Sequence, residues 1–367
     1  MTGDPAPAAA GKKAAAARRD TDDAAGPAKK AKAPAAERTS IPRCEMPRKA
    51  GPGGPTFKAL SWNVAGLRGL LNNGNGSVLR DLVESEQPDV VCLQEHKLQA
   101  SHVAECEAQL RTLLGPRYGA FYWAVSVEKK GYSGIVVICK GPHSSTTMSA
   151  GNAPVTKQQT TLGGQEVPWG AAGAPVSCRF GLGADNGHGG EGRCLSLEFE
   201  RFWVVCLYCP NSGEGLKRLD YRLGEWERDL RAHVAFLSAK GKPVVLGGDL
   251  NVAYRDQDIY NVTAPHIKKS AGCTPQERAA FGQLCSETSL VDSLVHIHPG
   301  ATGAFSYWSQ RAGNRPFNRG LRLDYWLVSS NMADGQAAGP KLHDAFLCPD
   351  ATPGVSDHCP VGVTIEL

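Results

Sequence analysis

Polar side chains interrupt or end several strongly apolar segments of this sequence, and their types could do chemistry together. A polar group at the end of a buried strand costs free energy unless it is used, although a single Asp there is usually a turn or cap residue. A whole set of such residues is harder to explain as turn residues. They are Asn63, Glu95, Tyr208, Asn211, Asp249, Asn251, Asp324, Asp357 and His358.

These residue types suit the hydrolysis of a phosphoester. Carboxylates with Asn amides and one His, without a Ser or Cys nucleophile motif, are typical of a hard divalent cation with oxygen ligands. Cleaving a phosphodiester requires a water aimed at phosphorus, neutralisation of the developing charge and stabilisation of the departing oxygen. A carboxylate, hydrogen-bond donors and a metal supply these needs, so we predict a Mg²⁺ site, with Mn²⁺ as the alternative ion.

Short segments rich in β-branched and aromatic residues predict the strands that position these side chains. Several segments are continuously apolar, which is typical of strands buried on both faces. Two of them, 193–199 and 202–209, are spaced as a hairpin. The predicted strands are 57–64, 89–95, 133–140, 193–199, 202–211, 242–251, 321–329 and 359–367.

Helices are expected between these strands. Leu and other apolar residues recur at spacings of three and four from Leu219 to Leu237, which predicts an amphipathic helix packed on a sheet. A second helix is expected to begin at TPQER, where Thr274 can cap the helix and Glu277 can close a capping box. Strands and helices interleave without a strict βαβ repeat. The predicted fold class is therefore α+β, a sandwich of mixed sheets.

The first 55 residues differ in composition from the rest of the 367-residue chain. They hold 11 of the 40 basic residues, 6 of the 36 acidic residues and no aromatic residue. Such a segment cannot bury enough surface to offset its ordering entropy, so residues 1–55 are predicted to be a disordered basic tail rich in Ala, Pro and Lys. Residues 56–367, with a net charge of −1, are predicted to form a single catalytic domain. The Gly-, Ser- and Thr-rich interval 141–192 is predicted to be a low-complexity surface insertion in that domain.

The tail also bears on localisation and partners. Its cluster PAKKAKAPAAER favours nuclear import, with a plastid or mitochondrial transit segment as the alternative. Acidic residues such as Asp20, Asp22 and Asp23 count against a transit segment, because those segments are poor in acid. The tail could also serve as a binding segment for other proteins. No apolar run approaches the roughly 20 residues that cross a bilayer, so no membrane partner is expected.

The 12 cysteines are predicted to be reduced, because several of them lie inside apolar segments where a thiol serves as a small hydrophobe. Cys206 and Cys209 form a CxxC within a predicted strand, and no second pair completes a zinc site. Structural zinc or redox chemistry at this pair is the less favoured interpretation.

Taken in order, the motifs of the chain resemble those of the exonuclease III family of abasic-site endonucleases, within the endonuclease/exonuclease/phosphatase superfamily. The resemblance covers about residues 57–367. LQE, GDLN and SDH recur across the superfamily, whereas WNV with GLR, TPQER and GLRLDY are specific to this branch. The motifs are SWNVAGLR, CLQEHK, GYSG, LYCPN, RLDYR, GGDLNVA, AGCTPQER, GLRLDY and SDHCP.

The resemblance implies both a fold and an activity. The fold is a four-layer α/β sandwich, in which two packed mixed sheets are flanked by helices and the motif loops gather at one edge. The activity is Mg²⁺-dependent cleavage of double-stranded DNA 5′ to an abasic site, leaving a 3′-hydroxyl, in base excision repair. Lesser 3′-phosphodiesterase and 3′→5′ exonuclease activities, and a monomeric enzyme, are implied as well.

The resemblance also assigns metal and base residues. It implies that Glu95 is a principal Mg²⁺ ligand, with Asn63 beside it. Asp357 would lie near the metal and the leaving group. Asp249 would orient or deprotonate the attacking water.

Further roles concern the phosphate. By resemblance, His358 contacts a nonbridging oxygen as imidazolium, and Asp324 orients that ring and raises its pKa. The remaining residues of the phosphate site would stabilise the same oxyanion. They are Tyr208, Asn211 and Asn251.

Substrate recognition needs two further groups of residues. An enzyme that acts on a missing base flips the sugar into a pocket too small and apolar to hold a base, and the candidate walls of that pocket are Phe305, Tyr307, Trp308, Leu321 and Leu323. A nearly neutral domain that binds a polyanion must cluster its positive charge on one face. The candidate contacts to the DNA backbone are Arg68, Tyr132, Arg218, Arg222, Lys268, Lys269 and Arg311.

The chain departs from the family pattern at two of these motifs. Ala65 stands where the family usually has an acid or an amide after WNV, so we expect weaker Mg²⁺ binding with activity retained. Glu214 stands where animal members carry a DNA-contacting Arg, so we expect faster product release. His96 matches no family role.

Two alternatives remain open. A catalytically weakened DNA-binding or redox-regulatory protein would account for Ala65, the cysteines and the basic tail, but the intact Glu95, Asp249 and His358 argue against it. A phosphoesterase of the same superfamily could act on an inositol phosphate or RNA, but GLRLDY and TPQER argue against that. Metal-dependent incision of abasic DNA distinguishes an abasic-site endonuclease from both alternatives.

Overall fold

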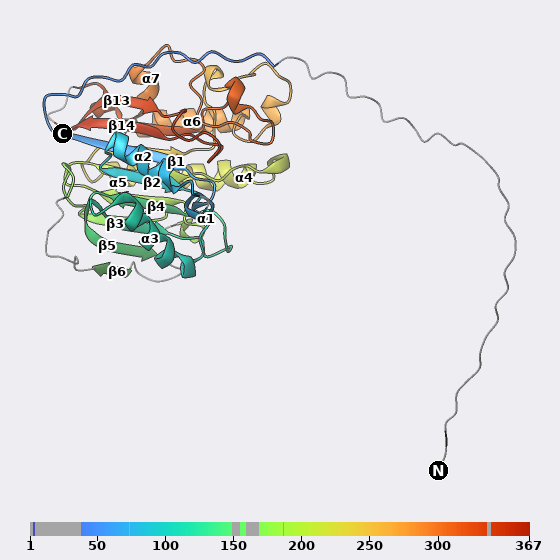
Figure 1. The fold of residues 1–367 in the computed structure, drawn as a ribbon. Coiled ribbons are helices and arrows are strands. Elements are labelled where there is room, and N and C mark those ends of the chain that lie inside the picture. Colours follow the sequence, from blue (N-terminus) through green and yellow to red (C-terminus); the bar gives the residue numbers. More distant parts are fainter. Residues whose placement is uncertain are drawn as a thin grey trace, which may run out of the picture. The chain divides into compact units, whose positions relative to one another are not determined.

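Two mixed β-sheets pack face to face in the computed structural model of the chain (Figure 1). Residues Thr39–Leu367 form one unit, and the description below concerns that unit. Most of the predicted tail lies outside the described residues. The structure describes residues 3, 38–72, 74–148, 155–158, 169–185, 187–335 and 339–367.

The larger sheet has eight strands in the order β13-β14-β1-β2-β4-β3-β5-β6. β1 pairs parallel with β2, and β3 pairs parallel with β5, whereas the other neighbours are antiparallel. Its strands are β1 (Thr56–Asn63), β2 (Val90–Gln94), β3 (Tyr118–Ala124), β4 (Ile135–Cys139), β5 (Gly141–Met148), β6 (Val155–Gln158), β13 (Lys341–Leu347) and β14 (Val361–Glu366).

The smaller sheet has six strands in the order β11-β12-β10-β9-β8-β7. β9 and β10 are parallel, and the other neighbours are antiparallel. The predicted hairpin is confirmed as β8 and β9. The strands are β7 (Ser177–Phe180), β8 (Cys194–Glu198), β9 (Trp203–Tyr208), β10 (Val244–Asp249), β11 (Leu290–Asp292) and β12 (Asp324–Ser329).

Helices cover the outer faces of both sheets. α1, α2 and α3 pack on the larger sheet, and α5 and α6 pack on the smaller one. Short 3₁₀ helices span Gly189–Glu191, Glu214–Leu216, Asp256–Asp258, Ile267–Lys269 and Arg315–Phe317. The α-helices are α1 (Leu67–Asn72), α2 (Gly76–Glu86), α3 (Ala100–Leu114), α4 (Leu219–Tyr221), α5 (Glu227–Ser238), α6 (Pro275–Thr288), α7 (Ser293–Ile297) and α8 (Ser330–Ala333).

The alternation of side chains along β1 explains the layers. Phe57 and Ala59 lie in the core between the two sheets, whereas Leu60 and Trp62 lie in the core under α1, α2 and α3. Successive residues of a strand point to opposite faces, so a strand that is buried at nearly every position fits only between two other layers. The predicted four-layer sandwich is thereby confirmed.

The two predicted helices have different outcomes. α6 begins as predicted, because the Thr274 hydroxyl accepts from the Glu277 backbone N–H at 3.1 Å and the Glu277 carboxylate accepts from the Thr274 N–H at 3.2 Å. The stripe from Leu219 to Leu237 is not one regular helix. A π-helical turn, Arg222–Trp226, separates α4 from α5. Such a turn changes which side chains face inward, and it often marks a functional site.

The prediction of a surface insertion at 141–192 is wrong for its described parts. β5 pairs with β3 in the larger sheet, and β7 pairs with β8 in the smaller one. Ser and Thr dominate β5, so it lacks the apolar alternation that predicts a strand, although β-branched Thr favours extended backbone. Residues 149–154, 159–168 and 186 lie outside the described residues.

The predicted tail boundary at residue 55 is also wrong. Residues 39–55, here called the N-terminal strap, run along the domain without regular secondary structure. The Ile41 N–H donates to the Phe317 carbonyl at 2.9 Å, and the Cys44 N–H donates to the Thr302 carbonyl at 3.0 Å. Ile41, Cys44 and Met46 pack on small apolar clusters of the domain, and this apolar burial holds the strap in place.

Arg48 is the strap residue with the most contacts to charged and aromatic groups. Its guanidinium lies 3.2 Å from the centre of the Phe346 ring and pairs with Asp344 at 2.9 Å and Glu86 at 3.0 Å. Removing it leaves the buried Asp344 carboxylate without this partner, so Arg48→Ala should lower the free energy of unfolding by about 1 to 2 kcal/mol. Urea denaturation would measure the loss.

The matched control is Arg43→Ala in the same strap. Arg43 pairs with Asp350, whose side chain is 84% exposed, so that change should cost less than about 0.5 kcal/mol. Equal effects of the two substitutions would contradict the account of Arg48.

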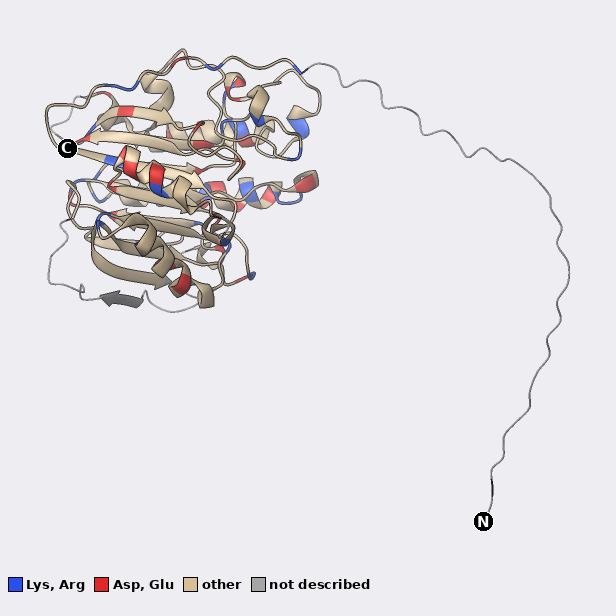
Figure 2. Cartoon of the chain, viewed as in Figure 1, with Lys and Arg blue, Asp and Glu red and all other residues tan. Residues whose placement is uncertain are grey.

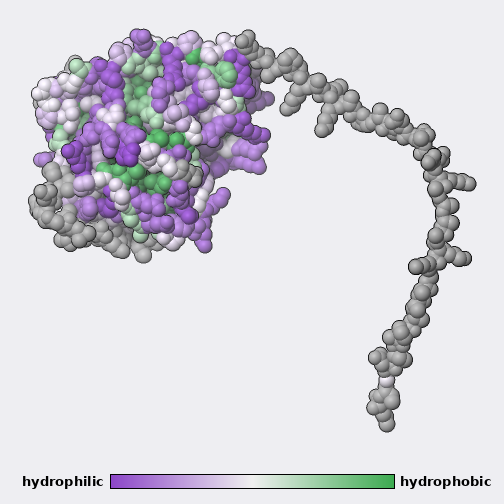
Figure 3. Space-filling model, in the orientation of Figure 1, coloured by the Kyte–Doolittle hydropathy of each residue, from purple (hydrophilic) through white to green (hydrophobic). Residues whose placement is uncertain are grey.

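The surface of the domain is mixed in character. Figure 2 shows that Lys, Arg, Asp and Glu lie mainly on helices and loops, whereas the strands are mainly tan. The face seen in Figure 3 is largely hydrophilic, with smaller apolar areas. No helix within the described ranges combines the length and the hydropathy that a membrane span requires.

Candidate active site

Strand ends from both sheets meet at one place and carry the predicted polar side chains. Asn63 is the last residue of β1, and it pairs with Gln94 at the end of β2. Asp249 is the last residue of β10, where it pairs with Tyr208 of β9 and Asp324 of β12. The Asn63 Nδ2 donates to Asp249 Oδ2 at 2.9 Å, which joins the two sheets directly at the site.

The loops that follow these strands turn sharply. Ala65, Glu95 and Asn251 all have left-handed backbone, with φ of 53°, 60° and 50°. Asn tolerates this conformation better than most residues, whereas Ala and Glu adopt it rarely. Backbone strain of this kind persists where the surroundings fix it, and it clusters at functional sites.

Asp249 is buried and accepts several hydrogen bonds. Besides Asn63, its donors are the Asn251 backbone N–H at 2.9 Å and the Asn251 Nδ2 at 3.2 Å. Asn251 is itself held by Asn211, whose Nδ2 donates to Asn251 Oδ1 at 2.8 Å. The structure therefore brings these four predicted residues together around one carboxylate, with Asn211 at the exposed rim.

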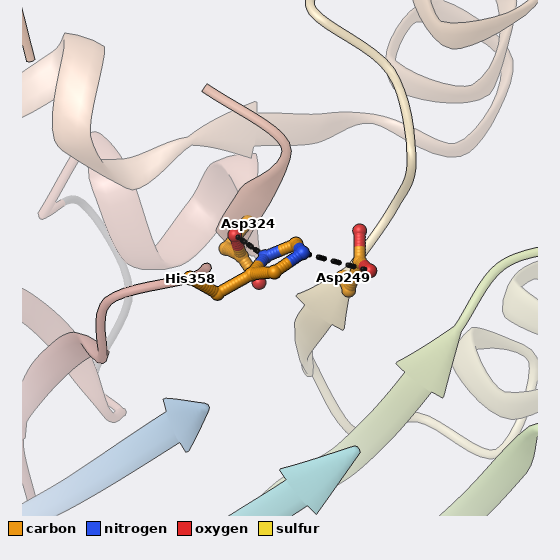
Figure 4. A group of neighbouring side chains, drawn as sticks. All are labelled: Asp249, Asp324 and His358. Carbon is orange, nitrogen blue, oxygen red and sulfur yellow. Dashed lines mark hydrogen bonds and ion pairs between the residues drawn. The ribbon is translucent and has the colours of Figure 1, made fainter. Parts of the chain in front are cut away.

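His358 lies between two carboxylates (Figure 4). Its Nδ1 is 2.7 Å from Asp324 Oδ2, and its Nε2 is 3.9 Å from Asp249 Oδ2. Ser306 fixes this arrangement from behind, because its hydroxyl donates to Asp324 Oδ2 at 2.7 Å. That hydroxyl also accepts from the backbone N–H groups of Leu323 and Asp324.

The charges of this group shift its pKa values. Burial acts to lower the pKa of His358, but the carboxylates of Asp324 and Asp249 outweigh it and raise that pKa to about 10. Burial raises the pKa of Asp249 to about 7, while the His358 imidazolium opposes the shift. At neutral pH His358 is therefore a cation. Asp249 titrates where a general base is most effective.

Tyr208 lies at the edge of the same group. Its side chain is mostly buried, and the Arg193 guanidinium lies 4.5 Å from the centre of its ring. Burial raises the pKa of Tyr208, and the negative charges of Glu95 and Asp249 raise it further. Tyr208 is therefore a neutral phenol that can donate a hydrogen bond.

The residues predicted to bind metal lie in different settings. The Glu95 side chain is 21% exposed, and its Oε1 pairs with Lys97 Nζ at 2.9 Å. Asp357 is half-buried next to His358 and contributes to the raised pKa of that ring. Asn63 directs its amide nitrogen to Asp249, and its amide oxygen accepts from the Ala65 N–H at 3.0 Å. Its amide therefore supports Asp249 and holds the turn at Ala65.

The donor set fits a hard divalent cation. Among the described residues, Asp249, Asp324 and His358 form a cluster whose ligand atoms all lie within 4.8 Å of one another. The imidazolium of His358 cannot ligate a metal, but Asp324 Oδ1 is buried without a hydrogen-bond partner among the described residues. Glu95 adds a partly exposed carboxylate outside this cluster, and carboxylate oxygens are the ligands that Mg²⁺ prefers.

The candidate DNA contacts divide into two groups. Tyr132 and Arg218 are half-buried and joined, since Arg218 Nη1 donates to the Tyr132 hydroxyl at 2.7 Å. The other candidates except Arg222 carry exposed cationic side chains. They are Arg68, Lys268, Lys269 and Arg311.

The prediction that Arg222 grips DNA is wrong. Its side chain is 1% exposed and lies in the π-helical turn. It pairs with Glu227 and donates to the carbonyls of Pro210 and Leu250 at 2.6 Å and 2.7 Å. Arg222 therefore anchors the loops that carry Asn211 and Asn251, and a buried Arg with all these partners is not available to phosphate.

The apolar wall beside His358 is smaller than predicted. Tyr307, Leu321 and Leu323 lie in one cluster, and the Tyr307 ring centre is 5.0 Å from that of His358. Ile259 and Ile267 are among the other residues of that cluster.

Two of the predicted wall residues, Phe305 and Trp308, lie elsewhere, in a separate cluster with Cys359. The Trp308 side chain is buried, and its Nε1 donates to Asn318 Oδ1 at 3.1 Å. The prediction is wrong for these two because Tyr307 and Trp308 are successive residues of an extended segment and face opposite sides, and the bend at Ser306 turns Phe305 to the side of Trp308.

Residues 60–358 match the Endonuclease/Exonuclease/phosphatase family. The chain belongs to this family. A DNA-(apurinic or apyrimidinic site) endonuclease of Dictyostelium discoideum is 34% identical to it over 312 residues, which cover 85% of this chain and 71% of that protein. An exodeoxyribonuclease of Bacillus subtilis is 36% identical over 311 residues, covering 85% and 100%.

A solved structure agrees with these relatives. The AP endonuclease LMAP from Leishmania major superposes with a TM-score of 0.68 and 30% identity, covering 89% of this chain and 93% of that one. The DNA repair nuclease APEX1 of Danio rerio is 35% identical over 83% of this chain and 81% of its own length. The predicted family, its exonuclease III branch and the enzyme class are thereby confirmed.

Within this family fold, sequence reasoning missed several supporting residues. Ser306 and Arg193 carry no distinctive spacing, since Ser306 lies outside the predicted strands and Arg193 is a single charged residue at the start of one. His96 was assigned no role. It is buried, its Nδ1 accepts from the Leu98 N–H at 2.9 Å, and its Nε2 lies 3.2 Å from the Ala124 carbonyl. Burial lowers the pKa of His96 to about 4, so a neutral ring holds the turn after Glu95.

Proposed function

We propose that this protein is a Mg²⁺-dependent endonuclease that hydrolyses the phosphodiester 5′ to an abasic site in double-stranded DNA and leaves a 3′-hydroxyl, in base excision repair. The observation that carries the proposal is the buried Asp249, held by amide donors next to an imidazolium that Asp324 orients. That arrangement provides a base for water and a cation for phosphate within one group. The names of the relatives support DNA as the substrate.

In this proposal four residues act directly on the attacking water and the phosphate. Asp249 accepts the proton of the attacking water, because its pKa of about 7 leaves it largely deprotonated at slightly alkaline pH. His358 donates from Nε2 to a nonbridging phosphate oxygen as imidazolium. Asn211 and Tyr208 donate to the same phosphate and stabilise the charge that develops on it.

The metal complements these groups. Glu95 would hold the ion with Asp357 nearby, and a bound Mg²⁺ would neutralise charge on the phosphate and on the leaving oxygen. The part-exposed setting of Glu95 suits an ion that keeps several of its waters. Mn²⁺ offers the same ligand preferences and is the alternative ion.

The apolar cluster next to His358 accounts for substrate choice in the proposal. Tyr307, Leu321 and Leu323 present apolar side chains, which favour a bare sugar over a polar base edge. The same centre would carry out 3′-phosphodiesterase and 3′→5′ exonuclease reactions on DNA ends. We further propose a nuclear, monomeric enzyme whose N-terminal region engages repair proteins.

The test is incision of a labelled duplex that contains one tetrahydrofuran abasic analogue, with Mg²⁺ or with EDTA. We expect cleavage 5′ to the analogue with Mg²⁺ only, and no cleavage of an intact duplex. Binding without incision would overturn the proposal in favour of a DNA-binding or redox-regulatory protein. Hydrolysis of RNA or an inositol phosphate in place of the abasic duplex would identify a different phosphoesterase.

Ala65→Asp should strengthen metal binding. Residue 65 lies beside Glu95, because Lys97 Nζ bonds both Glu95 Oε1 and the Ala65 carbonyl at 3.3 Å. A carboxylate there adds an oxygen donor and can draw the Lys97 ammonium from Glu95. Asp also suits the left-handed backbone at this position. The Mg²⁺ concentration for half-maximal incision should fall by about 3-fold to 10-fold, which corresponds to about 1 kcal/mol.

The control for this change is Ala65→Asn, which suits the same backbone but adds no charge. A metal titration of the incision rate would compare the three proteins. An unchanged Mg²⁺ requirement in Ala65→Asp would contradict the role given to this position.

A further inference from the structure

Arg193 is a buried cation next to the candidate site, and no role has been assigned to it. It follows the 3₁₀ helix Gly189–Glu191 and immediately precedes β8. Its side chain is 2% exposed. A charged group so deeply buried is costly unless partners compensate it, so its contacts are informative about its role.

The first set of contacts is with Tyr208. The Arg193 guanidinium lies 4.5 Å from the centre of the Tyr208 ring, and its Nη1 donates to the Tyr208 carbonyl at 3.1 Å. The Tyr208 N–H in turn donates to the Arg193 carbonyl at 2.9 Å. Main chain and ring of Tyr208 are thus both held by one residue, directly beside Asp249 on the neighbouring strand.

The second set of contacts is with Tyr132. Arg193 Nη2 and Arg218 Nη1 both donate to the Tyr132 hydroxyl at 2.7 Å. A phenolic oxygen that accepts two such bonds has its own O–H left to donate. Lys129 Nζ also lies 5.0 Å from the centre of the Tyr132 ring. Two cations thus bond the hydroxyl and a third lies over the ring, so the proton of this hydroxyl suits an anionic acceptor such as a backbone phosphate.

Glu191 closes the network. Its carboxylate pairs with Arg193 Nε and with Arg218 Nη2, the latter at 2.7 Å. Gly192 between Glu191 and Arg193 has φ of 63°, and a Cβ there would lie 2.7 Å from the Ala124 carbonyl. The tight turn therefore requires glycine, and it directs both charged side chains to the same place.

We propose that Arg193 is a positioning residue that holds Tyr208 of the active site and Tyr132 of the DNA-contacting surface in one rigid unit. Contact of the DNA backbone with Tyr132 and Arg218 then fixes the phenol of Tyr208 against the reacting phosphate. The inference rests on the proposed function and deepens it. A shift of even 1 Å in such a group is enough to slow a positioned reaction about 100-fold.

The test compares Arg193→Met and Arg193→Lys in single-turnover incision of the abasic duplex, with duplex affinity measured in EDTA. Arg193→Met should slow incision by about 10-fold to 100-fold and weaken duplex binding several-fold. Arg193→Lys keeps the charge but loses the planar fork, so it should recover only part of the rate. It also carries the test if Arg193→Met fails to fold.

Arg111→Met is the matched control for loss of stability. Arg111 of α3 also contacts an aromatic ring and a carboxylate. Its guanidinium lies 4.5 Å from the Phe121 ring centre and pairs with Glu107 at 2.8 Å. Arg111→Met should lower the melting temperature while keeping the incision rate within about twofold of that of the wild type. An equal loss of rate in both variants would show that Arg193 acts through stability alone and would overturn the inference.

A double-mutant cycle separates positioning from general damage. Tyr132→Phe should weaken duplex binding in the wild type but add little in Arg193→Met, because the hydroxyl is already misplaced there. Additive effects of the two changes would overturn the inference while leaving the proposed function intact. Failure of the wild type to incise the duplex would instead overturn the proposed function and, with it, this inference.

Discussion

Asp249→Asn is expected to reduce single-turnover incision of abasic DNA by a factor on the order of 1,000, because an amide cannot take the proton of the attacking water. The side chain keeps its size, so the fold around it should persist. Its surroundings nevertheless oppose an amide, since Asn63 Nδ2 and Asn251 Nδ2 both donate to Asp249 Oδ2. An NH₂ group placed there would face two donors, which adds to the loss.

Duplex affinity distinguishes this expectation from a loss of folding. Binding of the abasic duplex in EDTA should stay within a few-fold of the wild type, since removing a negative charge does not weaken contact with a polyanion. Asp344→Asn is the matched control. Asp344 of β13 is also buried, but it pairs with Arg48 of the N-terminal strap. A comparable loss of incision in both variants would contradict the role of Asp249.

The strands that carry the site could be predicted because each one ends on a polar residue. Asn63 and Asp249 follow runs of buried residues, and in a sheet the ends of neighbouring parallel strands lie together. Their mutual hydrogen bond could not be predicted, because it joins strands from different sheets that are 186 positions apart. Only the packing of the two sheets sets that distance.

The direction of the side chains explains why the predictions for Arg222 and for two of the pocket-wall residues were wrong. The RLDYR motif presents Arg218 and Arg222 as equivalent cations, but a π-helical turn directs Arg222 into the core and leaves Arg218 at the rim. Similarly, the bend at Ser306 breaks the alternation of an extended segment, so that Phe305 joins Trp308 in one cluster while Tyr307 faces another. Neither irregularity has a sequence signal of its own, so the residue types are predictable and their orientations are not.

Asp324→Asn is expected to make incision sensitive to alkaline pH. Ser306 donates to Asp324 Oδ2, the same oxygen that accepts from His358 Nδ1, so an amide should keep its oxygen there. Its nitrogen would then replace Asp324 Oδ1, which has no hydrogen-bond partner among the described residues. The substitution therefore removes a charge while the orientation of the ring is kept.

The sign of the effect follows from the pKa of His358. That pKa is raised to about 10 in the folded protein, so the imidazolium and the stability of its ion pairs are fully present below about pH 6.5 and are lost as the pH rises through 10. Without the Asp324 charge the pKa of His358 falls toward 6.5. The imidazolium is then lost within the working range of the enzyme.

Single-turnover incision across pH measures this shift. At about pH 6 the variant should cut within several-fold of the wild type, whereas at about pH 8.5 the wild type keeps its imidazolium and the variant has lost most of it, so the rate should be lower by a factor on the order of 10 or more. Ser306→Ala is the companion variant, because it loosens the carboxylate but keeps its charge. Its alkaline limb should stay near that of the wild type. A deficit in Asp324→Asn that is the same at every pH would mean that Asp324 acts through geometry and not through charge on His358.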